Sequence, residues 1–209
     1  MTERIKRWIA DTWCGVSGLE QLFGLKAGMS LHELSALTPL VPVPGAQGLY
    51  CTMQLPQAWP EFERYVLEIS PTRGLCKIVA HTPTLYSDAS GKCLRGCFDG
   101  VAARIHRRAN SSQRYDVYQS GSVFADPDLW MVALHLGDAA LAELWTGSDL
   151  AGVVGVQAAA LRVKSVDVYR GALELMLELD NFQAHTADAD ALSRVRAQAT
   201  GAMPGCSVV

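Results

Sequence analysis

The chain lacks the segments that send a protein into or across a membrane. Its first residues, MTERIKRWIADTW, carry five charged side chains and contain no apolar core of the kind that a secretory signal needs. No run in the sequence approaches the ~18 apolar residues of a membrane span. We therefore expect a cytoplasmic protein, unless the chain is a mature form from which a signal was removed.

The sequence also lacks the short motifs of the common enzyme classes. No GxSxG, HExxH or GxGxxG occurs, and GLKAGMS does not end in the GKS or GKT of a phosphate-binding loop. The Gly121-Ser122 pair differs from a nucleophile elbow, because Val123 replaces the glycine that should follow the serine. The sequence indicates no catalytic residues, and we expect a protein that is not an enzyme.

The six cysteines have neither the spacing of a secreted disulfide scaffold nor a CxxC metal motif. Cys93 and Cys97 lie four residues apart, but no second pair of ligands such as HxxxH accompanies them. Free cysteine is among the most buried residue types. We predict that Cys76, Cys93 and Cys97 are buried thiols without a metal, and we expect no cofactor.

With 209 residues, of which 49% are hydrophobic and 19% charged, the chain is long enough to bury a substantial core. We expect one α+β domain over residues 1–209. Within it, residues 1–40 form an N-terminal helical segment and residues 200–209 a flexible tail. A possible short helix over residues 3–13 places its apolar side chains on one side.

The stretch from Phe62 to His81 predicts a β-hairpin around which the rest of the chain is arranged. Apolar and polar residues alternate on both sides of a turn at residues 71–74. One face of the hairpin is therefore apolar and needs a cover. A helix predicted over residues 92–108 supplies that cover, with an apolar stripe that includes Leu94, Phe98, Val101 and Ile105.

The remaining elements follow from capping and alternation. Ser30 and Glu33 form a capping-box pattern for a helix that Pro39 ends. Strands are expected at residues 49–55, 115–124, 153–164 and 169–180. Residues 129–145 are ambiguous between helix and hairpin, and we predict the hairpin. The predicted fold is an antiparallel sheet of about six to eight strands with one main helix packed on it and short terminal helices.

A set of short motifs extends over roughly residues 22–183. It consists of Phe23-Gly24, Gly28-Met29, Pro60 with Phe62 and Tyr65, Gly121-Ser122-Val123, Asp126-Pro127 and Trp130-Met131. This set resembles an uncharacterised family of bacterial α+β proteins. The resemblance implies two paired strands between Trp130 and Trp145 and supplies no catalytic residues. Members of that family look like bacterial immunity and accessory proteins.

Charge is distributed unevenly along the chain. Residues 1–125 hold 13 basic and 10 acidic side chains, whereas residues 126–190 hold 3 basic and 11 acidic ones. An acidic second half disfavours nucleic-acid binding there and favours a basic protein partner. We expect neither a nucleic acid nor a membrane as partner.

These patterns favour a non-catalytic protein-binding domain, in particular an immunity or inhibitor protein that neutralises a bacterial toxin or effector through an acidic surface. Such a domain needs aromatic anchors and charged contacts. The candidate contact residues are Trp130, Trp145, Tyr118, Tyr169, Glu174 and Glu178.

Two other functions stay open at the level of sequence. One is a small hydrolase or transferase that uses a cysteine or serine with a histidine, for example Cys76 with His81 or Cys51 with His135. The predicted strands place Cys76 and His81 on opposite faces, which argues against the first pair. The other function is a small-ligand carrier with its pocket between sheet and helix.

Overall fold

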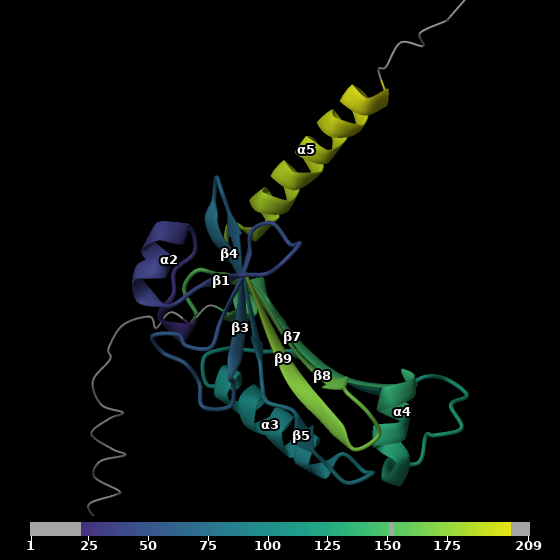
Figure 1. Cartoon of the computed structure of the whole chain (residues 1–209). Coiled ribbons are helices and arrows are strands. Elements are labelled where there is room, and N and C mark those ends of the chain that lie inside the picture. The colour runs from purple at the N-terminus through teal and green to yellow at the C-terminus, as the bar shows by residue number, and fades with distance from the viewer. Residues whose placement is uncertain (1–21, 151–152, 202–209) are drawn as a thin grey trace, which may run out of the picture.

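The computed structural model describes residues 22–150 and 153–201. The helix expected over residues 3–13 and almost all of the expected tail lie outside these ranges. The described residues form an α+β fold, with an open antiparallel sheet and helices packed against it (Figure 1). Within these residues no helix is long and apolar enough to cross a membrane.

The sheet has nine strands in the order β1-β2-β3-β4-β9-β8-β7-β6, with β5 also paired to β9. Every pairing is antiparallel. The strands are β1 (Val41–Pro42), β2 (Leu49–Thr52), β3 (Arg64–Ser70), β4 (Gly74–His81), β5 (Leu85–Tyr86), β6 (Gln113–Tyr118), β7 (Ala139–Thr146), β8 (Val156–Ser165) and β9 (Arg170–Leu179). The count exceeds the expected six to eight because β1 and β5, at two residues each, are too short to show alternation.

The described helices are more numerous than the single main helix and short terminal helices that we expected. The α-helices are α2 (Leu31–Leu37), α3 (Lys92–His106), α4 (Trp130–Leu136) and α5 (Phe182–Gly201), and the short 3-10 helices are η1 (Leu22–Gly24), η2 (Pro127–Leu129) and η3 (Gly147–Leu150). The capping box predicted for α2 is confirmed, since the Ser30 side chain accepts from the Glu33 amide and the Glu33 carboxylate accepts from the Ser30 amide.

The central hairpin is confirmed. Strands β3 and β4 pair from Arg64 with His81 to Ser70 with Gly74, and the register shifts by one residue next to Glu68. The predicted apolar face is buried, and it comprises Tyr65, Leu67, Ile69, Cys76, Ile78 and Ala80.

Helix α3 is found at the predicted place in the chain, but its main contacts are with β5, β8 and β9 and not with the central hairpin. On the hairpin itself, the rings of Phe23 and Phe62 pack against Tyr65. Leu94, Phe98, Val101 and Ile105 are all buried. The approach is close at Gly171 of β9, where an added Cβ would lie 2.8 Å from a Leu94 methyl carbon. The core therefore lies between the sheet and this helix.

The hairpin predicted over residues 129–145 is wrong in its first half. Residues 130–136 form helix α4, and only Ala139–Thr146 forms a strand. The paired strands that the family resemblance implied for this segment are therefore not found. A glycine at position 137 suits a hairpin turn, but with φ 84° it ends α4 in the left-handed conformation, and its amide donates to the Ala133 carbonyl.

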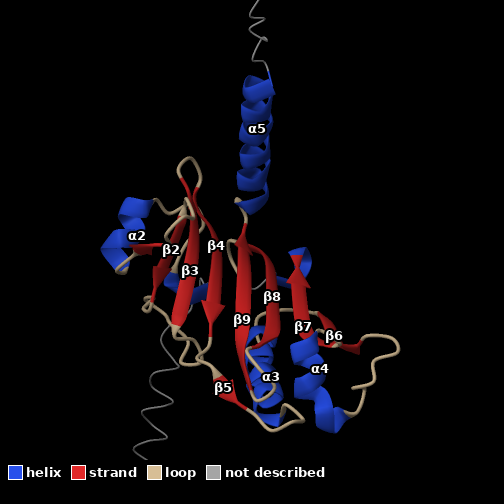
Figure 2. Cartoon of the chain, turned by 45° about the vertical axis from the view of Figure 1, so that its right-hand side comes forward, coloured by secondary structure: helices blue, strands red, loops and turns tan. Residues whose placement is uncertain are grey.

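Figure 2 shows α5 extending away from the sheet beyond the end of β9. The first turns of α5 contact the body of the protein. Asn181 donates to the carbonyls of Arg73 and Leu75, and Asp188 pairs with the Arg73 guanidinium at 2.6 Å. These contacts attach the start of α5 to the turn of the central hairpin.

Candidate functional site

The two faces of the sheet differ in what covers them. Helices α3 and α4 lie together on one face, since the Arg95 guanidinium stacks on the Trp130 ring at 4.3 Å. The sheet curves away from α3, so its other face is the hollow side of the curve (Figure 1). Among the described helices, only the first turns of α5 reach that second face, which we call the open face.

A continuous line of apolar side chains crosses the open face. Residues paired directly across an antiparallel ladder point to the same face, so the pairings trace a row perpendicular to the strands. The row runs through β2, β3, β4, β9, β8 and β7 and consists of Cys51, Val66, Val79, Met176, Ala160 and Leu144. We call these six residues the apolar row.

The apolar row is unusual for a face that meets water. All six side chains are half-buried by their neighbours in the sheet, and Val41, which pairs with Cys51 at one end, is 64% exposed. Antiparallel sheets with one solvated face normally place polar residues at the outward positions. A contiguous apolar surface of this kind marks a site of contact with another molecule.

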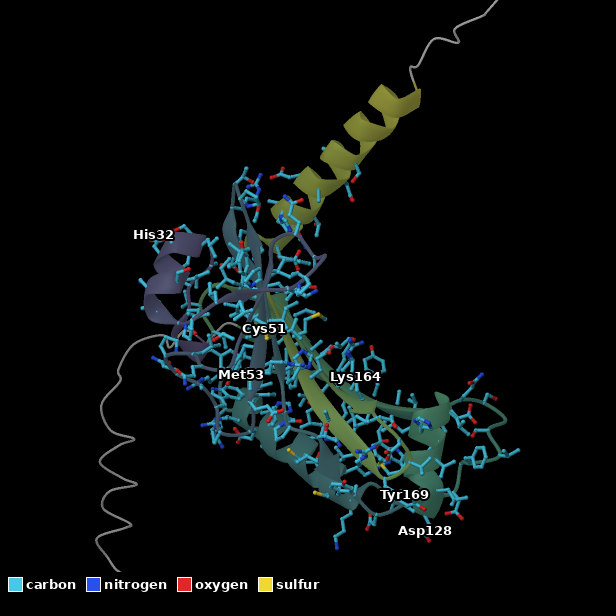
Figure 3. All side chains as sticks on the ribbon, in the orientation of Figure 1. His32, Cys51, Met53, Asp128, Lys164 and Tyr169 are labelled. Atoms are coloured by element: carbon cyan, nitrogen blue, oxygen red, sulfur yellow. The ribbon has the colours of Figure 1, made fainter. Side chains whose placement is uncertain are left out.

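A charged row runs parallel to the apolar row, displaced from it by two residues on each strand toward the same end of the sheet. It consists of Arg64, His81, Glu174 and Arg162, and Lys164 adds a further positive charge on β8. Figure 3 shows Lys164 on the side of the sheet away from α3. We call these five residues the basic cluster.

Glu174 holds the basic cluster together. Its carboxylate is only 5% exposed, and it accepts hydrogen bonds from Arg162 Nε at 2.7 Å and from Lys164 Nζ. Burial alone would raise the pKa of Glu174. The two hydrogen bonds and the positive charges of Arg162 and Lys164 outweigh burial and hold that pKa below its ordinary value.

His81 completes the cluster without adding charge at neutral pH. Its Nδ1 lies 3.7 Å from the Glu174 carboxylate. Burial lowers the pKa of His81 below its ordinary value, and the charge of Arg64 lowers it further. The basic cluster therefore holds three full positive charges against one carboxylate at pH 7, so this side of the open face is positive.

The opposite border of the apolar row is occupied by α5. His185 Nε2 lies 3.0 Å from the Glu68 carboxylate, and Lys77 Nζ lies 4.8 Å from the centre of the Phe182 ring. Lys77 also lies 3.9 Å from Glu178. The open face is thus bounded by α5 on one side and by the basic cluster on the other.

Two of the predicted contact residues are not on the surface. Trp130, at the start of α4, is fully buried next to Arg95 of α3, and Trp145 is fully buried in β7. Both belong to the core and offer no contact to a partner. Tyr118 is half-buried against the core, and Tyr169 is 62% exposed in the turn before β9. The structure does not bring these four aromatic residues together on one surface.

The two acidic residues predicted as contacts, Glu174 and Glu178, are engaged within the chain. Glu174 and Glu178 do point away from the buried leucines of β9, but Glu174 is buried and both side chains pair with cations of neighbouring strands. Five carboxylates of the acidic half bond to basic side chains within the chain: Glu143, Asp167, Glu174, Glu178 and Asp188. These five are fewer than half of the eleven carboxylates of residues 126–190, so the charge imbalance read from the sequence is reduced only in part.

The cysteine prediction holds for only one thiol of three. Cys76 is buried, and burial raises the pKa of its thiol, but Cys93 is exposed and Cys97 is half-buried. The helix turns Cys93 toward solvent, whereas Cys97 packs against the edge of the core. Among the described residues, no three His, Cys, Asp or Glu side chains are grouped so that they could hold a metal ion.

The cysteine–histidine pairs considered for an enzyme are not assembled. Cys76 lies on the buried face, whereas His81 lies on the open face. Cys51 is on β2, near one edge of the sheet, and His135 is on α4, which contacts β7 and β8. Ser122 donates to Asp138 at 2.9 Å and caps the Phe124 amide, so it stabilises a turn.

A histidine–carboxylate pair that sequence reasoning missed lies on the helix side. His106 Nε2 lies 2.7 Å from the buried carboxylate of Glu143, and the Ser112 hydroxyl donates to the same carboxylate at 2.5 Å. Because Ser112 bonds to the acid and not to the histidine, the order of a serine–histidine–acid triad is absent. The arrangement ties the end of α3 to β7.

The apolar row was also missed, although the sequence held a signal for it. Val66, Val79 and Met176 stand at the positions where alternation calls for polar residues. These apolar residues can be recognised as one continuous surface only when the order of the strands in the sheet is known.

Comparison with models of known protein families, with curated proteins and with solved structures gives no match for this chain.

Proposed function

We propose that this chain is a protein-binding module that holds its partner on the open face of the sheet. The observation that carries the proposal is the apolar row. It sets six apolar side chains next to one another on strands where a solvated face would present polar ones. A partner that covers them removes this apolar surface from water, which is the main favourable term in protein association.

The dimensions of the row favour a protein partner over a small ligand. Neighbouring strands lie about 4.8 Å apart, so six strands give a row roughly 24 Å long. Small-molecule sites are concave pockets that enclose most of the ligand surface. A long row on one face of a sheet instead fits an extended or helical segment of another protein.

The basic cluster defines the chemistry of the partner. Arg64, Arg162 and Lys164 lie along one side of the row, with a single carboxylate among them. A complementary segment presents apolar residues to the row and acidic residues to this cluster. The partner contact is thus apolar with an acidic border, in place of the basic partner expected from the sequence.

An immunity or inhibitor role is the narrower form of this proposal. Its support is the resemblance to bacterial immunity and accessory proteins. An inhibitor of a toxin or effector needs shape and charge complementarity and no reactive group. The open face meets that requirement.

The test compares capture of host proteins by the full chain, by Met176→Glu and by Val123→Glu. Met176 is at the centre of the apolar row, whereas Val123 is 83% exposed in the loop after β6 and serves as the matched control. A partner of the open face is retained by the unchanged chain and by Val123→Glu and is lost with Met176→Glu.

Binding of the purified partner is then measured on a biosensor. The proposal expects Met176→Glu to weaken the affinity at least about tenfold, equivalent to 1.4 kcal/mol. Equal affinities for Met176→Glu and Val123→Glu, with both variants folded, would contradict it.

A further inference from the structure

The two ends of the sheet are protected to different degrees. Strand β1, at one end, has two residues, and one of them is Pro42, which has no amide to donate. Strand β6, at the other end, has six residues and pairs with β7 alone among the described strands. Its outer backbone donors and acceptors are therefore open to a further strand.

Apart from the charges of Arg114 and Asp116, strand β6 lacks the features by which proteins block such edges. Its sequence, QRYDVY, contains no proline, lysine or glycine, and its register with β7 has no bulge. Five of its six residues are exposed, and they include Tyr115, at 43%, and Val117, at 49%. A long, regular and partly apolar edge of this kind is a template for strand pairing.

The side chains of β6 complement a second copy of themselves. In an antiparallel pairing of two β6 strands with Tyr115 at the twofold axis, Arg114 of each copy stands directly opposite Asp116 of the other. The two Tyr115 side chains meet on the open face, and Gln113 stands opposite Val117. Opposite charges and aromatic pairs at directly paired positions each stabilise a sheet, and like charges destabilise it.

The neighbouring registers are less favourable. A twofold axis at Arg114 or at Asp116 would place two like charges opposite each other. Residues paired across the interface must share a face, so the axis cannot lie between two residues. Charge therefore favours the register centred on Tyr115 over those centred on Arg114 and Asp116, and a twofold axis at Gln113 or Val117 would pair fewer residues of the two β6 strands.

The ion pairs between β6 and α3 hold these side chains in place. Arg114 bonds to Asp99 at 2.8 Å, and Asp116 bonds to Arg95 at 2.8 Å. Asp99 and Arg95 both belong to α3, so the two charged residues of β6 lie on the helix side of the sheet and leave Tyr115 on the open face. All four side chains are partly exposed, which leaves room for a further contact across the axis.

We propose that two copies of this chain form a twofold-symmetric dimer through antiparallel pairing of their β6 edges, with Tyr115 at the axis. The sheet then continues from one copy into the other. The open faces of both copies lie on the same side, and the two apolar rows, each of which meets β6 at Gln113, are offset by about four residues, or roughly 13 Å, along the strands. A single edge pairing buries less surface than a standard interface, so the dimer dissociates on dilution.

The register is tested by a disulfide across the axis. Directly opposite Cα atoms of an antiparallel pair lie about 4.5 to 5.5 Å apart, within the range of a disulfide. Tyr115→Cys is therefore expected to form a covalent dimer under mild oxidation. Gln113→Cys is the matched control, because its two copies lie about four residues, or roughly 13 Å, apart along the strands.

Both cysteine variants carry Cys93→Ser, which removes an exposed thiol of α3, and the linked peptides are identified by mass spectrometry. A Tyr115→Cys link formed much faster than a Gln113→Cys link supports the proposed register. Equal rates for the two variants, or no link at Tyr115→Cys, would overturn it.

Analytical ultracentrifugation over a range of protein concentrations tests whether the chain dimerises through the β6 edge. The unchanged chain and Val123→Lys are expected to dimerise alike, whereas Tyr115→Lys, which sets two lysines opposite each other, stays monomeric. The substituted position is exposed, so folding is retained and can be checked by circular dichroism.

A chain that sediments as a monomer at every concentration refutes the dimer. A Tyr115→Lys variant that dimerises like the unchanged chain refutes the β6 surface. If Met176→Glu abolishes dimerisation while Tyr115→Lys does not, the copies meet through their open faces and the inference is wrong.

Discussion

Glu174 shows how a single side chain can lie in a polar strand position and still be buried. Alternation along β9 places it on the face opposite the leucines, which is the open face. The two neighbouring strands then surround it, β8 with Arg162 and Lys164 and β4 with His81. A buried carboxylate is tolerated when several charged donors bond to it. The sequence shows its polar position but not its burial, because the partners come from other strands.

Glu174→Gln is predicted to lower the free energy of unfolding by about 1.5 to 3 kcal/mol at pH 7, the usual range for hydrogen bonds to a charged group. The pKa of Glu174 is lowered in the folded protein. Its stabilisation is therefore fully present above the ordinary glutamate pKa of about 4.3 and is lost as the pH falls toward the lower folded value.

Urea unfolding of the unchanged chain and of Glu174→Gln at pH 7 and near pH 3.5 measures this effect. The difference between the two proteins should shrink at the lower pH. Glu63→Gln, at an exposed position, is the control with a difference close to zero. A difference for Glu174→Gln that does not change with pH would show that the carboxylate charge is not the cause.

At the scale of elements, the central hairpin owes part of its position to the segment before α2. The Gly28 amide donates to the Leu75 carbonyl at 2.9 Å, and the Leu75 amide donates to the Met29 carbonyl at 2.8 Å. Gly74 lies directly beneath this segment, and a Cβ there would lie 2.1 Å from the Gly28 carbonyl oxygen. The Gly28-Met29 motif of the sequence thus corresponds to a backbone bridge to the hairpin turn.

Replacing a glycine of positive φ by alanine can destabilise the fold in two ways, through the left-handed backbone and through a clash of the added Cβ. Alanine substitutions at two glycines separate these two effects. Gly74 and Gly137 both have positive φ, 67° and 84°, but an added Cβ at Gly137 meets nothing within 4 Å. Gly137→Ala should cost only the left-handed backbone, about 1 to 2 kcal/mol. Gly74→Ala should cost clearly more, because backbone atoms must also move.

Thermal and urea unfolding of both glycine variants checks this order. A Gly74→Ala variant no less stable than Gly137→Ala would mean that the segment at Gly28 shifts freely and does not anchor the hairpin.

Elements with strong local signals were predicted correctly from the sequence. The hairpin has alternation and a turn, α2 has its capping box, and α3 has an apolar stripe, so all three were identified. Helix α4 was missed because Gly137 serves equally well as a hairpin turn or as a helix end. Tertiary packing decides between them, since Trp130 lies within reach of Gly91 and Arg95 of another segment.

The candidate site was less predictable than the fold for the same reason. The aromatic residues chosen as anchors are large and apolar, which suits a core as well as an interface, and Trp130 and Trp145 are in the core. The apolar row is built from one residue on each of six strands. Its members are between 13 and 125 residues apart in sequence, so no local pattern reveals it.

At the scale of the whole molecule, the charge of the partner distinguishes the two hypotheses. The basic cluster beside the apolar row favours an acidic partner, whereas the sequence led us to expect a basic one. Arg64 is exposed at the end of the charged row. Arg64→Glu is predicted to slow association with an acidic-bordered partner and to reduce the salt dependence of the association rate.

Biosensor kinetics at low and physiological salt measure both effects, with Arg107→Glu, an exposed change of the same charge just after α3, as the control. Faster association after Arg64→Glu would indicate a partner of the opposite charge and would remove the assigned role of the basic cluster.

Cys51 gives the most direct measurement of the central claim, because it is a native reporter within the apolar row. Its thiol is half-buried on the open face, whereas Cys93 is exposed on α3, on the other side of the sheet. The rates of maleimide labelling at both cysteines are measured by peptide mass spectrometry, for the chain alone and for the chain saturated with its partner. If the partner lies on the open face, labelling of Cys51 slows at least about tenfold, an effect of 1.4 kcal/mol or more, while labelling of Cys93 keeps its rate. An unchanged rate at Cys51 in the saturated complex would contradict the account.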